Sequence, residues 1–180
     1  QSPDSDFCLL TCPLCLLTFF SPEPRTLQHT VEAPCERLRR RNQPQAMLRV
    51  RLAGTLPGPE AQERFVPVPA TRGWRAGEFP EDARVAAALL CLYPHDHGVA
   101  IPLTVRATTL ARHAGQVSLP GGAKDADETL VEAALREATE EIGLDAASVR
   151  VLGELTPIHV LVSGFTLHPI VGVTDVRPDF

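Results

Sequence analysis

This sequence predicts a mixed α/β (α+β) fold in which a helix packs against one face of a mixed β-sheet. Two segments carry the prediction. Residues 83–93 form a nearly continuous apolar run with the length of a buried strand. Residues 125–143 instead place apolar side chains at helical spacing between a start signal and a stop signal. A chain of 180 residues is long enough for one domain with one core.

The remaining elements follow from shorter patterns. A short helix or strand is expected at 47–52, and a mostly irregular Pro- and Gly-rich segment at 57–80. A turn is expected at 94–98. Strands are expected at 83–93, 99–106, 149–157 and 165–174. Cys91 lies within the first of these strands, so it is expected to be a buried core thiol.

The helix has recognisable ends. Asp125 and Glu128 have the spacing of a capping box, and Asp127 is a competing N-cap residue. Gly143 supplies a C-terminal stop. Between these ends the sequence has room for about four helical turns.

The helix is predicted to have one apolar face and one acidic face. Val131, Leu135, Ala138 and Ile142 fall on one stripe, which is assigned to the core. The carboxylates of Glu137, Glu140 and Glu141 share another stripe, because residues three and four apart are neighbours on a helix. Arg136 lies beside these glutamates and is placed to orient one of them by a charge-assisted hydrogen bond.

Carboxylates at this density repel one another, so a positive charge is expected among them. Oxygen-only ligands favour a hard divalent cation, Mg²⁺ or Mn²⁺. The alternative is a solvated acidic helix with an internal Arg–Glu pair. Gly121 and Gly122 favour the cation site, because two glycines permit positive φ and a close approach of the backbone to a ligand.

The segment resembles the Nudix box, Gly-x5-Glu-x7-Arg-Glu-U-x-Glu-Glu-x-Gly-U, where U is apolar. The match is complete, with Ala138 as a soft first U; the matching residues are Gly122, Glu128, Arg136, Glu137, Ala138, Glu140, Glu141, Gly143 and Leu144. The resemblance implies a Nudix α/β/α sandwich and the hydrolysis of a nucleoside diphosphate linked to another group.

Residues upstream of the box resemble the signature of the coenzyme A pyrophosphatases within that superfamily. Arg106, Gly121 and Gly122 fit this signature, whereas Ala111 stands where its second arginine is expected and Leu119 replaces a phenylalanine. The resemblance implies that Arg106, Arg112, His113 and Gly121 bind substrate. Arginine forks suit the phosphates of coenzyme A.

The resemblance also implies roles within the box. Glu137, Glu141 and Glu140 would hold Mg²⁺ or Mn²⁺, with the Gly122 carbonyl completing the shell. Glu137 or Glu140 would act as general base, and Arg136 would orient a carboxylate. Glu128 would bind a further metal or stabilise the junction between loop and helix. The products from coenzyme A would be 3′,5′-ADP and 4′-phosphopantetheine.

The chain is expected to divide at Met47, its only methionine. Residues 1–46, rich in Pro, Cys and Arg, are interpreted as an extension outside the fold, and residues 47–180 as the Nudix domain. A domain of this family is expected to continue with another strand and a C-terminal helix, so the domain is interpreted as C-terminally incomplete. An uncovered sheet face would favour association, such as a homodimer.

Composition bounds the partners. The net charge of −5 argues against a nucleic-acid binder, and the apolar run at 7–20 is too short to span a membrane. Cysteine usage suits a reducing cytoplasm. Two alternatives to coenzyme A hydrolysis stay open: a Nudix hydrolase acting on ADP-ribose or another nucleotide, and a non-catalytic binding protein on a Nudix scaffold.

Overall fold

The computed structural model describes residues 43–63, 75, 77–96, 98–105, 117–161 and 163–180. The elements are α1 (Gln43–Leu52), α2 (Pro59–Glu63), β1 (Arg84–His95), β2 (Gly98–Ala100), β3 (Thr104–Val105), β4 (Val117–Ser118), β5 (Gly121–Ala123), α3 (Leu130–Ile142), a 3₁₀ turn η4 (Ala146–Ser148), β6 (Arg150–Glu154), β7 (Ile158–Val160) and β8 (Phe165–Val173).

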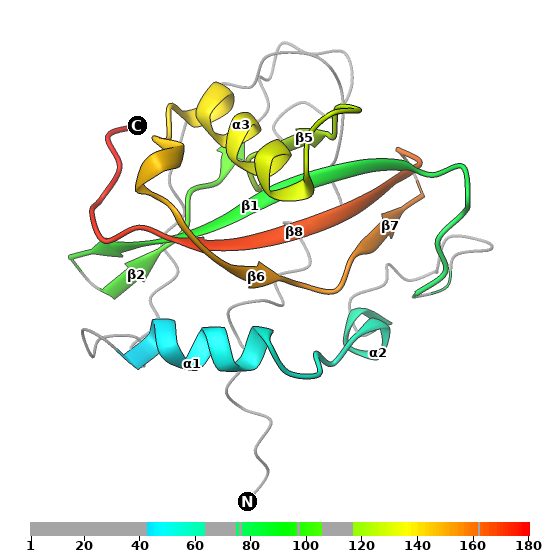
Figure 1. Ribbon diagram of the computed structural model, residues 1–180, viewed down its shortest axis with the longest axis horizontal. Helices are drawn as coiled ribbons and strands as arrows, with labels where there is room; N and C mark the ends of the chain where they lie inside the picture. The colour runs from blue at the N-terminus through cyan, green and yellow to red at the C-terminus, as the bar shows by residue number, and fades with distance from the viewer. Residues whose placement is uncertain (1–42, 64–74, 76, 97, 106–116, 162) are drawn as a thin grey trace, which may run out of the picture.

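The main sheet is built around the parallel pair of β1 and β8 (Figure 1). β2 and β5 pair with β1, and β6 and β7 pair with β8, all antiparallel. The expected mixed sheet is therefore confirmed. β3 and β4 form a separate two-stranded sheet.

Strand β1 is buried on both faces, as its continuous apolar run requires. Its even-numbered residues from Ala86 to Leu92 join one core cluster, and Ala87, Leu89 and Cys91 join the other. Cys91 is fully buried, and burial raises the pKa of its thiol to about 12. The expectation of a core thiol is confirmed.

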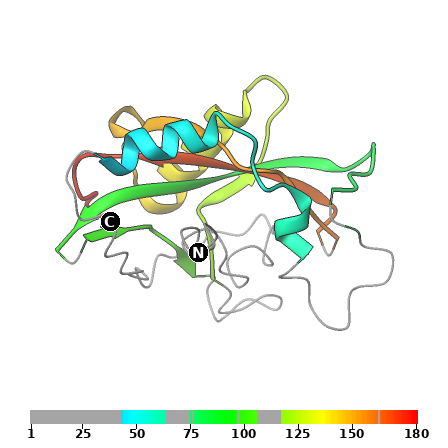
Figure 2. The ribbon, with the colours of Figure 1, turned by 90° about the horizontal axis from the view of Figure 1, so that it is seen from below.

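Each face of the sheet carries a helix. α3 packs through Ala134, Ala138 and Ile142 on one face, whereas Leu48 and Leu52 of α1 pack on the cluster of the other face. Figures 1 and 2 show the two helices on opposite sides of the β1–β8 pair. The result is the α/β/α layering that the resemblance implies, with α1, and not the expected C-terminal helix, on the second face.

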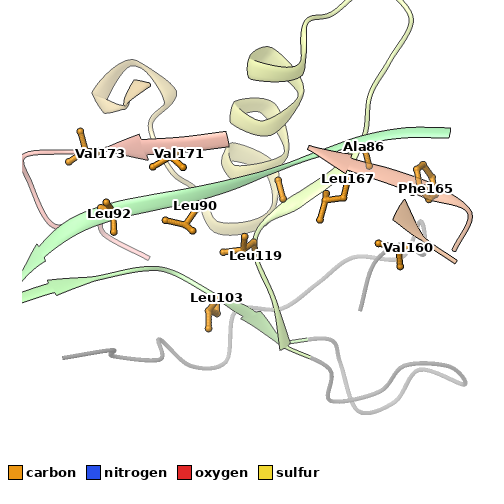
Figure 3. Packing of buried hydrophobic residues seen from close by; sticks show 11 residues of the cluster. Ala86, Leu90, Leu92, Leu103, Leu119, Val160, Phe165, Leu167, Val171 and Val173 are labelled. Carbon is orange, nitrogen blue, oxygen red and sulfur yellow. The ribbon is translucent and has the colours of Figure 1, made fainter. Parts of the chain in front are cut away.

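The core on the α1 side extends across several strands (Figure 3). Leu90 and Leu92 of β1 lie beside Val171 and Val173 of β8 in this cluster. Leu103, next to β3, belongs to the same cluster, so the small sheet packs against the main one on this side. Burying a leucine or valine side chain fully stabilises a fold by about 1.5–3 kcal/mol.

Several expected boundaries are wrong. The strand expected at 99–106 is interrupted, because β2 ends at Ala100 and β3 contains only Thr104 and Val105. Pro102 lies in the gap, and proline cannot donate to a strand ladder. β1 runs past Tyr93 to His95, which pairs with Gly98 across a tight turn. Residues 121–123, where no strand is expected, form strand β5.

The segment at 47–52 is helical, the alternative that the sequence left open, as part of α1. The irregular segment at 57–80 contains the short helix α2, while its residues 64–74 and 76 lie outside the described residues.

The start of α3 also corrects the sequence reading. The N-cap is Thr129, whose side chain accepts from the Glu132 backbone N–H while the Glu132 carboxylate accepts from the Thr129 N–H. Glu128 does accept from the Asp125 N–H at 2.7 Å, but this bond closes a turn ahead of the helix. The stop is as expected: Gly143 adopts a left-handed conformation with φ 68°.

The buried face of α3 only partly matches the expected stripe, because Ala138 and Ile142 are buried as expected whereas two other predicted positions are not. Val131 and Leu135 are only partly buried, and the fully buried positions are Ala133, Ala134 and Ala138. These alanines meet Ala87 of β1 in the same cluster. Small side chains on both elements let the helix lie close to the sheet, and Val131 and Leu135 pack at the margins of the contact.

Helix α1 begins at Gln43, ahead of Met47. Gln45 donates to Asp175 at 3.1 Å and accepts from Arg150, so α1 is tied to β6 and to the segment after β8. Arg150 also donates to Asp175 at 3.5 Å, and the pKa of Asp175 is lowered by the hydrogen bond from Gln45 and then by the one from Arg150. Residues 1–42 of the expected extension lie outside the described residues. No helix in the described ranges is long and apolar enough to cross a membrane.

Replacing the N-cap residue tests the start of α3. Thr129→Ala should lower the free energy of unfolding by about 1 kcal/mol, because a backbone N–H of the first turn loses its acceptor. Asp127→Ala should change it by less than about 0.5 kcal/mol. Urea unfolding of both variants measures the difference. A larger loss for Asp127→Ala would place the cap at Asp127 instead.

Candidate active site

The candidate site lies where α3 approaches strand β5. Gly122 pairs with Ala87 and faces α3. A Cβ atom at Gly122 would lie 1.8 Å from a carboxylate oxygen of Glu137. The backbone N–H of Gly121 donates to the Glu141 carboxylate at 3.1 Å. Glu137 and Glu141, one helical turn apart, are thus both held against the same short strand.

Gly121 and Gly122 matter because they have no side chain. The expected close approach is present, but neither Gly121 nor Gly122 has a positive φ, so that part of the prediction is wrong. A Cβ atom at Gly121 would lie 2.6 Å from the Ala87 carbonyl oxygen. Both residues adopt ordinary strand conformations in which no side chain fits.

Arg136 is the centre of the charged network. It donates from Nε and Nη2 to the two carboxylate oxygens of Glu128, at 3.1 and 2.8 Å. It donates from Nη1 to Glu137 at 2.9 Å and to Glu140 at 3.4 Å. Nη2 also donates to the Ala123 carbonyl at 3.1 Å. One guanidinium therefore joins strand β5, the turn before α3 and the glutamates of α3.

The Glu128–Arg136 pair is a bidentate fork, the strongest common form of ion pair. The hydrogen bond from Arg136 is the main reason that the pKa of Glu128 falls to about 2, with the Asp125 N–H contributing. The same bond raises the pKa of Arg136 above its usual range. Glu128 is therefore ionised at neutral pH, and it fixes the position of Arg136.

The oxygen donors suit a hard cation. Glu137 and Glu141 lie beside the backbone of Gly121 and Gly122, and carboxylate and carbonyl oxygens are the ligands that Mg²⁺ and Mn²⁺ prefer. Across the described ranges, no three His, Cys, Asp or Glu side chains are arranged so as to hold a metal ion. The third carboxylate of the stripe, Glu140, is instead turned toward Arg136.

Part of the predicted site lies outside the described residues. Arg106, Arg112 and His113, expected to bind substrate, fall within 106–116. The structure brings together Arg136, Glu137, Glu141, Gly121 and Gly122, and it places Glu140 at the exposed edge of the group, with 59% of its side chain exposed.

One contact in the site and one away from it were not expected from the sequence. The Ala123 carbonyl accepts from Arg136, and this contact depends on strand β5, which the sequence does not predict. Farther away, Glu154 of β6 and His168 of β8 contact one another at 2.6 Å. The two residues are 14 positions apart, and only the pairing of their strands brings them together.

A helix that carries glutamates against a glycine strand, on one face of a mixed sheet, defines an α/β protein with a candidate cation site. The family model of the NUDIX domain matches residues 82–171, which is 90 of the 180 residues. The chain belongs to the Nudix family.

Curated relatives share the same part of the chain. A protein of Cronobacter sakazakii named "Uncharacterized Nudix hydrolase NudL" is 50% identical over 78 residues, which cover 43% of this chain and 39% of that protein. Its namesake in Pectobacterium atrosepticum is 43% identical over 98 residues, covering 54% and 50%. The matched part thus spans half or less of the length of these two relatives.

Solved structures resemble the fold over a similar span. The Nudix hydrolase RenU of M. smegmatis is 29% identical, with a TM-score of 0.44 over 53% of this chain and 63% of its own. The Ap4A hydrolase of C. elegans is 16% identical, with a TM-score of 0.41 over 54% and 72%.

Alanine at the two glycines should have different effects. Gly121→Ala meets backbone and should lower the free energy of unfolding by about 1–3 kcal/mol. Gly122→Ala meets the end of a flexible side chain, so it should cost less stability while displacing the Glu137 carboxylate. Urea unfolding of both variants measures this. Equal losses would contradict the close approach of Glu137 to Gly122.

Acid unfolding should report the Glu128–Arg136 pair. The pKa of Glu128 is lower in the folded protein, about 2, than its ordinary value of 4.5. Its ionised form therefore stabilises the fold above pH 4.5, and this contribution is lost as the pH falls toward 2. The difference in unfolding free energy between the wild type and Glu128→Gln should shrink across that interval, measured in EDTA. Glu63→Gln, on the exposed end of α2, serves as the control, and a constant difference for Glu128→Gln would refute the expectation.

Proposed function

We propose that this chain is the core of a Nudix hydrolase that requires Mg²⁺ or Mn²⁺ and cleaves a diphosphate linkage in a nucleoside diphosphate derivative, with coenzyme A or its derivatives as substrate. The observation that carries the proposal is the placement of Glu137 and Glu141 together against the Gly121–Gly122 backbone. Two carboxylates beside close backbone make an anionic site at which a cation and a diphosphate can meet.

Each residue has a role in this proposal. Glu137 and Glu141 hold the cation, and Glu140 and the Gly122 carbonyl complete its ligands. A divalent cation bound there neutralises charge on the diphosphate and lowers the pKa of bound water. Glu137 or Glu140 accepts the proton from the attacking water. Arg136 orients Glu137 through the 2.9 Å bond, and Glu128 holds Arg136.

The choice of coenzyme A rests on the sequence ahead of the box. Arg106, Arg112 and His113 resemble the substrate-binding positions of coenzyme A pyrophosphatases. Coenzyme A carries a diphosphate and a 3′-phosphate, and arginine matches such groups with paired hydrogen bonds. Cleavage of the diphosphate gives 3′,5′-ADP and 4′-phosphopantetheine.

The substrate assay compares coenzyme A, ADP-ribose and nucleoside triphosphates, each with Mg²⁺, with Mn²⁺ and with EDTA. Coenzyme A should be the preferred substrate by kcat/KM, and EDTA should abolish turnover. Preference for ADP-ribose or a nucleotide would overturn the substrate but keep the reaction class. Failure to turn over any substrate would leave the scaffold as a binding protein.

The glutamates can be tested individually. Glu141→Gln should lower kcat by about 100-fold or more, because an amide supplies no charge to the cation. Glu63→Gln, which changes the same group on α2, should leave kcat within about twofold. Steady-state kinetics at saturating Mg²⁺ measures both. Unchanged turnover in Glu141→Gln would remove Glu141 from the cation site.

A further inference from the structure

The contacts of Arg136 are unequal in strength. Two hydrogen bonds join it to Glu128, whose side chain is 15% exposed, and one bond of 2.9 Å joins it to Glu137, which is 17% exposed. The contact with Glu140 is a single one of 3.4 Å to a side chain that is 59% exposed. In addition, Arg136 precedes Glu140 by four residues, and a cation ahead of an anion is the less favourable order on a helix.

We infer that Arg136 is an internal counter-ion that competes with a divalent cation for the glutamates of α3, and that it yields Glu140 when the cation binds. The inference rests on the proposed function, because it takes Glu137, Glu140 and Glu141 as the cation's ligands. It adds that Arg136 opposes cation binding, besides orienting Glu137.

The local charges support this competition. Three carboxylates, those of Glu128, Glu137 and Glu140, contact a single guanidinium, and the Glu141 carboxylate is held beside strand β5 by the Gly121 N–H. Without a divalent cation, Arg136 is the charge that makes this density tolerable. A cation placed among the same glutamates repels Arg136 and needs the same oxygens.

The geometry indicates which contact breaks. The Glu128 fork and the bond to the Ala123 carbonyl involve groups ahead of α3, so Arg136 keeps three hydrogen bonds if it loses the α3 glutamates. Glu140 has the longest and most exposed contact, and exposed pairs of this kind contribute little. Glu140 is therefore the carboxylate that can turn to a cation at least cost.

The competition has a consequence that distinguishes it from a purely orienting role. If Arg136 only aligned the carboxylates, its removal would weaken cation binding. If it competes for them, its removal strengthens cation binding while destabilising the cation-free protein. The two effects are coupled, so the cation should raise the melting temperature of the variant more than that of the wild type.

The test measures Mn²⁺ dissociation constants by calorimetry, and melting temperatures with and without Mn²⁺, for the wild type, Arg136→Gln and Arg150→Gln. Arg150 is the matched control, since it pairs with Asp175 away from the glutamates and its loss changes the net charge equally. Arg136→Gln should bind Mn²⁺ about three- to fivefold more tightly, the size of a partly exposed ion pair. Arg150→Gln should bind within about twofold of the wild type.

The outcomes separate the two proposals. If the wild type binds no Mn²⁺, the proposed cation site itself fails. If the wild type binds Mn²⁺ and Arg136→Gln binds it equally or more weakly, the competition alone is refuted. If Arg136→Gln does not fold, the inference is tested on the wild type instead. Nitrogen-15 NMR then follows the guanidinium signals of the wild type during a Mg²⁺ titration. The Nε–H signal of Arg136 should persist, because this group is bonded to Glu128, while its Nη signals should shift. Nη signals that do not shift as Mg²⁺ is added would overturn the inference.

Discussion

The close approach of α3 to β5 is the constraint on which the rest of the site depends. It requires two positions without side chains on the strand, because Glu137 fills the space at Gly122 and the Ala87 carbonyl fills it at Gly121. It also requires compensation for the negative charge of the carboxylates that it brings together beside the strand. The Gly121 N–H and the guanidinium of Arg136 supply that compensation.

The inner face of the same helix explains how the approach is reached. Ala133, Ala134 and Ala138 pack on Ala87, so α3 lies closer to the sheet than leucines at these positions would permit. A larger side chain at these positions would increase the distance between α3 and the sheet, and the glutamates would then lie farther from β5. The core and the site are therefore linked by geometry. The alanines determine the distance between α3 and the sheet, and this distance determines the position of the carboxylates.

The sequence predicted the parts of this structure that depend on local pattern. The apolar run of β1, the stop at Gly143 and the glutamate stripe follow from spacing along one element. Prediction from the sequence was wrong where the structure of a segment depends on a competing residue or on a partner far away in the chain. Thr129 starts α3 because its box with Glu132 outcompetes the one with Glu128, which is held by Arg136 instead. Residues 121–123 become a strand only because β1 offers them an edge.

The buried stripe of α3 was predicted correctly at Ala138 and Ile142 but not at Ala133 and Ala134, for a related reason. Helical spacing identifies the apolar positions, but it does not show how close the facing surface lies. Alanines at 133 and 134 are only weakly apolar in the sequence, yet they belong to the contact surface because Ala87 of β1 faces the helix. A pairing of small residues on two separate elements has no signal within either segment alone.

The central pair of strands has a consequence for the order in which the molecule is made. Arg84 of β1 pairs with Phe165 of β8, 81 positions later, and every glutamate of the site lies in the chain between them. Closing so long a loop costs entropy before its contacts repay it, and pairings of this kind slow folding. Ile170 of β8 is also part of the surface on which α3 rests. A chain emerging from the ribosome thus carries the complete set of site residues, together with β1 and β5, before it has β8, which completes the surface under their helix.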